Sequence, residues 1–321
     1  MRMFDMFCGG GGSSRGAVLA GVTPVAALDM WKLATDTYQM NFSDATIYQM
    51  KAGSLSPARI VREVGKIDLL LASPECTSHS VAKGNRPRCE KSRATAFEVI
   101  RFAKVLRPRW LVVENVMQMR LWHRFDEWHR KIRAIGYNTS VGVLDAQYYC
   151  TPQSRRRLFV VGDLEDMPSL PTPGQRTQKT VNSILGRGEP NDGPWSFSPV
   201  ISPNRAKATI QRAQRAVEEL GDGVPFIMVY YGSDGAGGFQ ALDRPLRTVT
   251  TLDRFAFVRP NGSGYEMRML QPPELAAAMG FPGHHVWARS TRRERIKLIG
   301  NAVCPPVMRA VVKALIDRAR G

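Results

Sequence analysis

The chain has 321 residues, enough for one large domain or two unequal ones with a substantial core that needs no disulfide bonds. Its formal net charge of +17 favours a polyanionic partner such as nucleic acid, although solubility or an anionic membrane surface would also account for it. The five cysteines include no Cys-x-x-Cys pair, which argues against a disulfide framework and against a structural zinc site. The sequence has neither the apolar core of a signal peptide nor the run of about 18 apolar residues that a membrane span requires. These features favour a reduced, cytoplasmic protein.

The first half of the chain alternates short apolar runs with amphipathic segments. The runs typical of buried strands occupy residues 4–7, 24–28, 67–72, 110–113 and 158–161. Helical periodicity between them predicts helices over residues 33–42, 58–64, 94–106 and 125–135. Such alternation predicts an α/β fold, with a mostly parallel sheet and helices on both of its faces.

The pattern changes after residue 163. Residues 164–203 hold seven prolines, which predicts irregular connections and turns. An amphipathic helix is expected at about 205–220, then a strand at 226–231 and a glycine-rich loop at 232–238. Helical patterning returns from residue 272 and ends in a helix at 307–319.

A glycine-rich turn follows the first predicted strand. Residues 5–12 read Asp-Met-Phe-Cys-Gly-Gly-Gly-Gly, and a helix is expected to open near Ser13. Glycines there allow a ligand to approach the backbone, and Asp29 closes the next strand, where a carboxylate can hold a ribose hydroxyl. This context favours a nucleotide-like cofactor, although such turns also exist only to permit tight packing.

Cys76 lies just past the strand at 67–72, at the sheet edge where open α/β folds bind ligands. Several Lys and Arg residues follow within 83–93, and cationic neighbours raise the reactive thiolate fraction of a cysteine. A buried, inert thiol is the ordinary alternative for a cysteine.

Charged residues mark the ends of two more strands. Glu114 closes the strand at 110–113, where a carboxylate is costly to bury without a partner or a task, and a structural salt bridge is the alternative. Arg155 and Arg157 point to the same side of an extended segment. Together they can hold phosphates, a carboxylate or a polarised carbonyl, unless they form a solvated charge run.

In this order the residues resemble the motifs of the DNA cytosine-5 methyltransferases, enzymes that use S-adenosylmethionine. The resemblance runs over nearly the whole chain, and the complete series is a far stronger signal than any single motif. It matches a bacterial and phage-like branch that has Ser-Pro-Glu-Cys around the nucleophile. The matching segments are residues 5–12, Asp29, Cys76, 93–97, 114–116, 153–157, 244–250 and 300–303.

The resemblance implies a Rossmann-like methyltransferase sheet with a small, irregular target-recognition domain. Phe7 would stack on the adenine of the cofactor, and the carboxylate of Asp29 would hold its ribose. The cofactor-binding residues implied in this way are Phe7, Gly9, Gly11, Gly12, Asp29, Met30, Ser54, Pro74, Asn301 and Val303.

Two positions depart from the pattern of the family. The family usually has Pro directly before the nucleophile, whereas here Pro74 stands one position earlier and Glu75 intervenes. Ser54 stands where the family commonly offers an Asp to the adenine amino group, so it can form a hydrogen bond there only without charge.

The resemblance also implies the roles of four catalytic residues. The Cys76 thiolate would add to carbon-6 of a flipped cytosine, while Glu114 holds or protonates ring nitrogen-3. Arg157 would donate to the carbonyl at position 2, with Arg155 supporting the site or its backbone. The basic stretch at 83–93 would close over DNA, with Gly84 as its hinge. The expected DNA-binding residues are Ser80, Lys83, Arg86, Arg88, Arg93, Gln153, Gly237 and Arg244.

We expect a catalytic and cofactor-binding domain at 1–163, a target-recognition domain at 164–271 and C-terminal helices at 272–321 that return to the first domain. The expected partner is double-stranded DNA, bound by a monomer without a metal ion, with a restriction endonuclease acting separately. Methylation of RNA on the same scaffold and a non-catalytic DNA-binding module remain alternatives. A nicotinamide-dependent dehydrogenase would share the glycine turn but would not explain Cys76, Glu114 and Arg157 together.

The positive charge is unevenly distributed. Residues 1–163 hold 24 Lys and Arg against 14 Asp and Glu, and residues 243–321 hold 14 against 6. Residues 164–242 hold 7 against 8 and are nearly neutral. The flanking segments should therefore grip phosphates regardless of sequence, while the neutral segment reads bases.

Overall fold

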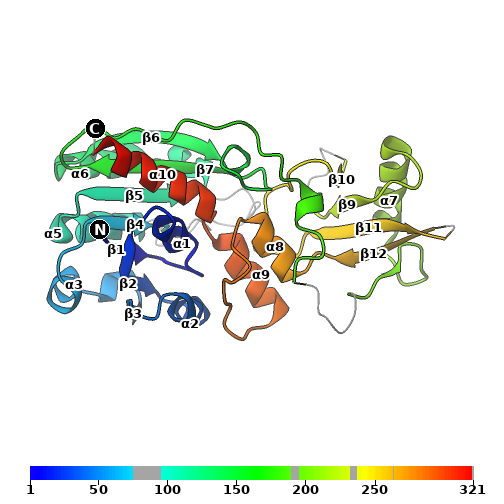
Figure 1. Ribbon diagram of the computed structural model, residues 1–321, viewed down its shortest axis with the longest axis horizontal. Helices are drawn as coiled ribbons and strands as arrows, with labels where there is room; N and C mark the ends of the chain where they lie inside the picture. The colour runs from blue at the N-terminus through cyan, green and yellow to red at the C-terminus, as the bar shows by residue number, and fades with distance from the viewer. Residues whose placement is uncertain (75–94, 189–194, 232–236, 263, 320–321) are drawn as a thin grey trace.

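The computed structural model describes residues 1–74, 95–188, 195–231, 237–262 and 264–319. These residues contain two β-sheets, one of seven strands and one of five. The two sheets lie toward opposite ends of the molecule, with α8 (Pro272–Ala278) and α9 (Arg292–Asn301) between them (Figure 1).

The seven-stranded sheet has the order β3-β2-β1-β4-β5-β7-β6. β7 alone runs in the direction opposite to the other six strands. The order reverses between β1 and β4, and ligands bind at such a switch point, outside the carboxyl ends of the strands. The strands are β1 (Arg2–Met6), β2 (Thr23–Asp29), β3 (Thr46–Gln49), β4 (Leu69–Ala72), β5 (Trp110–Asn115), β6 (Asn138–Asp145) and β7 (Arg156–Asp163).

Helices cover both faces of this sheet, as the sequence predicts. Leu69 and Leu71 of β4 pack in one core cluster with the C-terminal helix, whereas Leu70 and Ala72 face a second cluster on the opposite side. The first face carries α1 (Gly12–Val18), α2 (Lys32–Asn41) and α10 (Pro305–Arg318). The second carries α3 (Pro57–Val64), α5 (Thr95–Leu106) and α6 (Phe125–Ala134).

The five apolar runs and four amphipathic segments predicted in the first half are confirmed as strands and helices, with shifts at their ends. The sequence did not reveal β3 and β6, which form the two edges of the sheet. Edge strands bury fewer apolar side chains, and most residues of β6 are only half-buried. Their periodicity is therefore weak.

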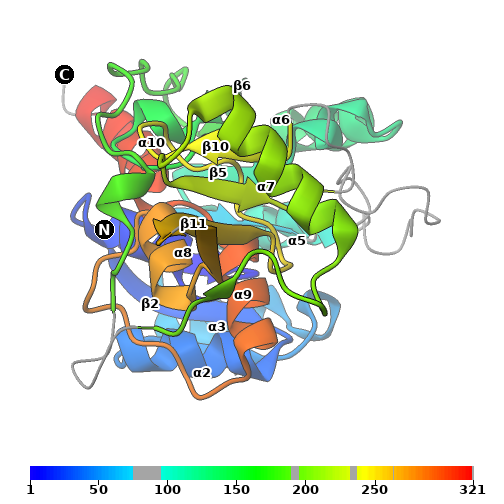
Figure 2. The ribbon, with the colours of Figure 1, turned by 90° about the vertical axis from the view of Figure 1, so that its right-hand side faces the viewer.

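The expectation of an irregular second domain is wrong for its later part. Residues 195–269 include an antiparallel sheet of order β10-β9-β11-β12-β8, and α7 (Lys207–Leu220) packs across it (Figure 2). Only α7 and β9 were predicted, although an Asn-Gly pair between two alternating runs marks the β11–β12 hairpin. The strands are β8 (Ser198–Pro199), β9 (Phe226–Val229), β10 (Phe239–Ala241), β11 (Phe255–Asn261) and β12 (Gly264–Met269).

Within the described residues one stretch, Arg292–Arg318, has the length and hydropathy of a membrane span. Of its most apolar window, 67% is buried inside the protein, and residues 302–304 separate it into α9 and α10. A buried, interrupted stretch of this kind is typical of helices in a protein core.

The C-terminal helix α10 packs closely on α1, the helix after the glycine turn. A Cβ atom added at Gly16 of α1 would overlap the Pro305 carbonyl oxygen and lie 2.7 Å from Cβ of Met308. Two segments almost 300 residues apart in sequence thus meet backbone to backbone.

This contact predicts that Gly16→Ala destabilises the protein by about 2 kcal/mol, because forced overlap in a packed interface costs more than the substitution gains. Helix propensity alone predicts the opposite sign, a gain of roughly 1 kcal/mol. Chemical denaturation followed by circular dichroism measures the difference. Gly283→Ala is the control, since its added Cβ meets no atom within 4 Å. Equal or greater stability of Gly16→Ala would contradict the described packing.

Candidate active site

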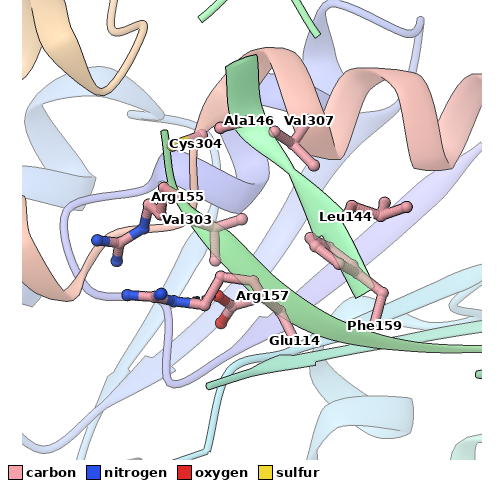
Figure 3. Close-up of a pocket in the computed structure, with 9 residues that line it drawn as sticks. All are labelled: Glu114, Leu144, Ala146, Arg155, Arg157, Phe159, Val303, Cys304 and Val307. Atoms are coloured by element: carbon pink, nitrogen blue, oxygen red, sulfur yellow. Dashed lines mark ion pairs between the residues drawn. The ribbon is translucent and has the colours of Figure 1, made fainter. Parts of the chain in front are cut away.

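A buried ion pair lies where β5 and β7 meet. Glu114 is opposite Phe159 in the register of these strands, and Arg157 precedes Phe159 by two residues, so both side chains share one face. The Arg157 Nε lies 3.4 Å from Oε1 of Glu114, whose residue is only 6% exposed (Figure 3). Burial raises the pKa of Glu114, and the charges of Arg157 and then Arg155 oppose that rise. The carboxyl group is therefore suited to take up or hold a proton.

The neighbouring Arg155 contacts the backbone of distant segments. Its Nη1 donates to the carbonyl of Val249 at 2.8 Å, and its Nη2 donates to those of Gly300 and Ala302 at 2.9 and 3.1 Å. The side chain is buried. Arg155, which lines the same small pocket as Glu114 and Arg157, thus holds the backbone of two distant segments.

A small pocket adjoins the pair and contains a cysteine that the sequence reasoning overlooked. Cys304 is buried, and burial raises the pKa of its thiol to about 11, with weaker opposition from Arg155 and Arg157. This thiol is therefore protonated and not a ready nucleophile. Its position next to Val303 of the Gly-Asn-Ala-Val segment was the available signal. The pocket is lined by Glu114, Leu144, Ala146, Arg155, Arg157, Phe159, Val303, Cys304 and Val307 (Figure 3).

The segment that leaves β4 toward Cys76 is fastened to β5. Asn115 Nδ2 donates to the carbonyl of Pro74 at 3.1 Å, and Asn115 Oδ1 accepts from the backbone of Val116 at 2.9 Å. The chain two residues before Cys76 is thereby tied to the strand that carries Glu114. Outside the described residues lie Glu75, Cys76, Ser80, Lys83, Gly84, Arg86, Arg88 and Arg93.

The glycine turn combines an open position with two closely packed ones. At Gly9, with φ of +51°, an added Cβ would meet nothing within 4 Å, so this side of the turn is accessible. At Gly11, with φ of +82°, it would lie 2.7 Å from the Phe42 ring, and at Gly12 it would overlap the Val303 carbonyl. Tight packing explains two of the glycines, while Gly9 leaves room for a ligand. Phe7 also has a left-handed backbone, with φ of 59°.

Asp29 is oriented beside this open position. Its Oδ2 accepts from the backbone N–H of Gly9 at 3.0 Å, and its Oδ1 accepts from that of Trp31 at 2.9 Å. The N–H of Met50 donates to the carbonyl of Asp29, and Ser54, four residues farther along the chain, is exposed. Met30 is 56% exposed. An open glycine, an aligned carboxylate and accessible neighbours fit a cofactor that carries a nucleoside.

Asp5 lies buried beneath the turn. Its Oδ2 accepts from Oγ of Ser14 at 2.7 Å, and the same hydroxyl lies 2.7 Å from the hydroxyl of Tyr38. Burial, with a smaller contribution from the charge of Asp29, raises the pKa of Asp5 to about 7, against the hydrogen bond from Ser14. A carboxyl group under the turn thus changes charge near neutral pH.

This carboxyl predicts a measurable dependence of stability on pH. A pKa of about 7 in the folded state, above the ordinary 3.8, means that stability is full at low pH and is lost as the pH rises toward 7. Asp5→Asn removes that loss. The free energy of unfolding of the variant, relative to that of the unsubstituted protein, should therefore rise by about 3 kcal/mol from pH 5 to pH 8. Urea denaturation at both pH values measures it, with exposed Asp44→Asn as control. A difference that stays constant with pH would contradict the burial of an ionisable Asp5.

The other residues that were expected to bind cofactor or DNA, and that the structure describes, differ in their exposure. Asn301 is exposed at the end of α9, whereas Val303 is buried against the glycine turn. Arg244 is exposed, and Gly237 occupies a turn just before β10. Pro74 is buried at the end of the segment that Asn115 holds.

Gln153, an expected DNA contact, makes its observed hydrogen bonds within the protein. Its side chain is 0% exposed, with Nε2 donating to the carbonyl of Ala278 and Oε1 accepting from the N–H of Val249. Both ends of the amide are used by the backbone, so Gln153 joins β7 to the segments around α8 and residue 249. Among the described residues, no group of three His, Cys, Asp or Glu could hold a metal ion.

Known proteins match this chain along almost its whole length. The family model for C-5 cytosine-specific DNA methylases matches residues 1–317. The type II methyltransferase M1.HphI of Haemophilus parahaemolyticus is 26% identical over 327 residues, covering 97% of this chain and 86% of that protein. M.DdeI of Desulfomicrobium norvegicum is 30% identical over 176 residues, covering 52% of this chain and 42% of that protein. The chain spans 42% to 62% of the length of M.DdeI and two further type II relatives.

A solved structure supports the fold over the whole chain. The putative DNA modification methyltransferase encoded within a prophage of E. coli has a TM-score of 0.71 and 18% identity, and the match covers 100% of both chains. This likeness, together with the strand order, confirms the predicted Rossmann-like methyltransferase sheet.

Proposed function

Since the chain belongs to the C-5 cytosine-specific DNA methylase family, we propose that it transfers a methyl group from S-adenosylmethionine to carbon-5 of a cytosine flipped out of duplex DNA. The observation that carries the proposal is the buried Glu114–Arg157 pair beside the segment that leads to Cys76. A carboxyl group whose pKa is raised by burial, next to a guanidinium, suits a neutral ring that gains negative charge during the reaction.

The chain's own residues activate the cytosine. The thiolate of Cys76 adds to carbon-6, and the electron pair displaced toward ring nitrogen-3 is met by the proton held on Glu114. Arg157 donates to the carbonyl oxygen at position 2, and Arg155 keeps the surrounding peptide groups in place. Carbon-5 then acts as the nucleophile. A base removes the carbon-5 proton after transfer, and Cys76 leaves as its bond to carbon-6 breaks.

The cofactor supplies the electrophilic methyl group. Its nucleoside is proposed to lie at the open side of Gly9, with Asp29 on the ribose and the ring of Phe7 on the adenine. Gly11 and Gly12 shape the turn. The other proposed contacts are Met30, Ser54, Pro74, Asn301 and Val303.

DNA is proposed to lie between the two sheets. Residues 164–271 would form the target-recognition domain and residues 272–321 a C-terminal part, while the flanking segments of positive charge hold the phosphates. This grip offsets the few kcal/mol that extrusion of a base costs. The proposed contacts are Ser80, Lys83, Arg86, Arg88, Arg93, Gly237 and Arg244.

Several type II methyltransferases are relatives, which supports a place in a restriction–modification pair. The protein would then act in the cytoplasm as a monomer, independently of its endonuclease.

Cys76→Ser should abolish methyl transfer almost entirely while the affinity for S-adenosylmethionine stays unchanged, because a serine hydroxyl is a far weaker nucleophile. Transfer of labelled methyl groups to duplex DNA measures activity, and duplexes with 5-fluorocytosine should trap a covalent adduct at residue 76. Cys150→Ser replaces an exposed thiol and is the control. Substantial activity of Cys76→Ser would refute the assignment of Cys76 as the nucleophile. Methyl transfer to RNA but not to duplex DNA would refute the assignment of duplex DNA as the substrate.

Glu114→Gln should bind DNA normally but turn over about 10²–10⁴-fold more slowly, because the amide cannot supply a proton to ring nitrogen-3. Single-turnover kinetics with saturating cofactor and DNA give the rate. Glu165→Gln, at an exposed carboxylate remote in sequence from the pair, is the control. An unchanged rate for Glu114→Gln would remove this carboxyl group from the mechanism.

A further inference from the structure

One buried histidine contacts the glycine turn from a segment that no motif covers. Residues 281–288 lie in the connection between α8 and α9, and we call this segment the arch. In Figures 1 and 2 it runs beside α2. His285 lies in the arch, and its residue is only 5% exposed.

The arch is fastened to α2 by side chains. Asn41 Nδ2 donates to the carbonyl of Val286 at 2.7 Å, and Asn41 Oδ1 accepts from the N–H of Val286 at 3.0 Å. Farther along, the N–H of Ala288 donates to Oγ1 of Thr37 at 3.3 Å. The backbone on both sides of Val286 is therefore fixed, which fixes the place of the preceding His285.

From this position the His285 ring reaches the glycine turn. Its Nε2 lies 3.0 Å from the carbonyl oxygen of Gly10, and its ring centroid lies 4.6 Å from that of Phe281 and 4.7 Å from that of Trp287. A carbonyl only accepts, so Nε2 carries the hydrogen. Burial, and next the charge of Arg15, lowers the pKa of His285 to about 3, so the ring is neutral at physiological pH.

The contact restrains one peptide plane at both ends. The N–H of Gly11 donates to the carbonyl of Cys8 at 2.9 Å, and the carbonyl of Gly10, in the same peptide group, accepts from His285. A Trp287 ring carbon lies 3.0 Å from the place that a Cβ on Gly10 would take. The turn is thus closed on the side of the arch and open at Gly9.

We propose that His285 is a positioning residue for S-adenosylmethionine, whose Nε2–H holds the Gly10–Gly11 peptide in the orientation that receives the cofactor. The proposal rests on the proposed binding of the cofactor at this turn. A turn held in advance loses less entropy when the ligand binds. Losing the donor should therefore weaken cofactor binding while the chemical step at saturating cofactor keeps its rate.

The test compares two substitutions of the same residue. His285→Phe keeps an aromatic ring between Phe281 and Trp287 but has no donor, whereas the amide of His285→Gln places an N–H close to the position of Nε2. Isothermal titration of the full chain should give a dissociation constant for S-adenosylmethionine raised roughly tenfold in His285→Phe and largely restored in His285→Gln. The single-turnover rate at saturating cofactor should change in neither. Exposed His284→Ala is the control.

The outcomes separate this inference from the proposed function. Failure of the unsubstituted protein to bind the cofactor would refute the proposed function itself. Binding by the unsubstituted protein and His285→Phe with equal affinity would overturn the role of His285. Since both variants can lose stability, hydrogen exchange of the unsubstituted protein provides a second test. Cofactor should slow exchange in the arch together with residues 8–12, and protection of residues 8–12 alone would also overturn the inference.

Discussion

The site depends on one buried cation that joins segments from three regions of the chain. Arg155, just before β7, donates to the carbonyls of Val249, Gly300 and Ala302. Val249 lies in the connection between β10 and β11, which pairs with the chain just before β7 through Gln153 and Leu246. The other two carbonyls belong to the end of α9, next to the glycine turn. A carbonyl left unpaired in a buried place costs roughly 1–3 kcal/mol, so these three segments hold their arrangement together or lose it together.

Burial controls the charge of the groups around this arrangement. It raises the pKa of Glu114 and of Asp5 and lowers that of His285, so each group is biased toward its neutral form. Glu114 lies at the candidate site for the base, Asp5 lies under the glycine turn, and His285 contacts that turn from the arch. In contrast, the excess positive charge of the chain belongs to residues 1–163 and 243–321. The protein thus combines buried groups that are biased toward their neutral forms with an excess of positive charge that suits a polyanion.

Hydrophobic periodicity and residue type predicted those features of the fold that depend on short stretches of sequence. The apolar runs revealed the central strands, and the turn after β1 and Glu114 at the end of β5 were found from their places at strand ends. The edge strands β3 and β6 were not predicted because they bury few apolar side chains and their periodicity is weak. The partners of Gln153, Val249 and Ala278, could not be predicted because they are about 100 residues away and only the folded chain brings them together. The contacts of Arg155 and His285 were hidden for the same reason.

The role of Arg155 in holding these segments together is tested by hydrogen–deuterium exchange, followed by mass spectrometry, on Arg155→Met and on the unsubstituted protein. If the guanidinium of Arg155 holds the site together, exchange should accelerate at once in residues 249–254, 298–303 and 8–12, while β9 and β11 of the second sheet keep their rates. Unchanged exchange in those three segments, or a uniform acceleration across both sheets, would contradict this role of Arg155.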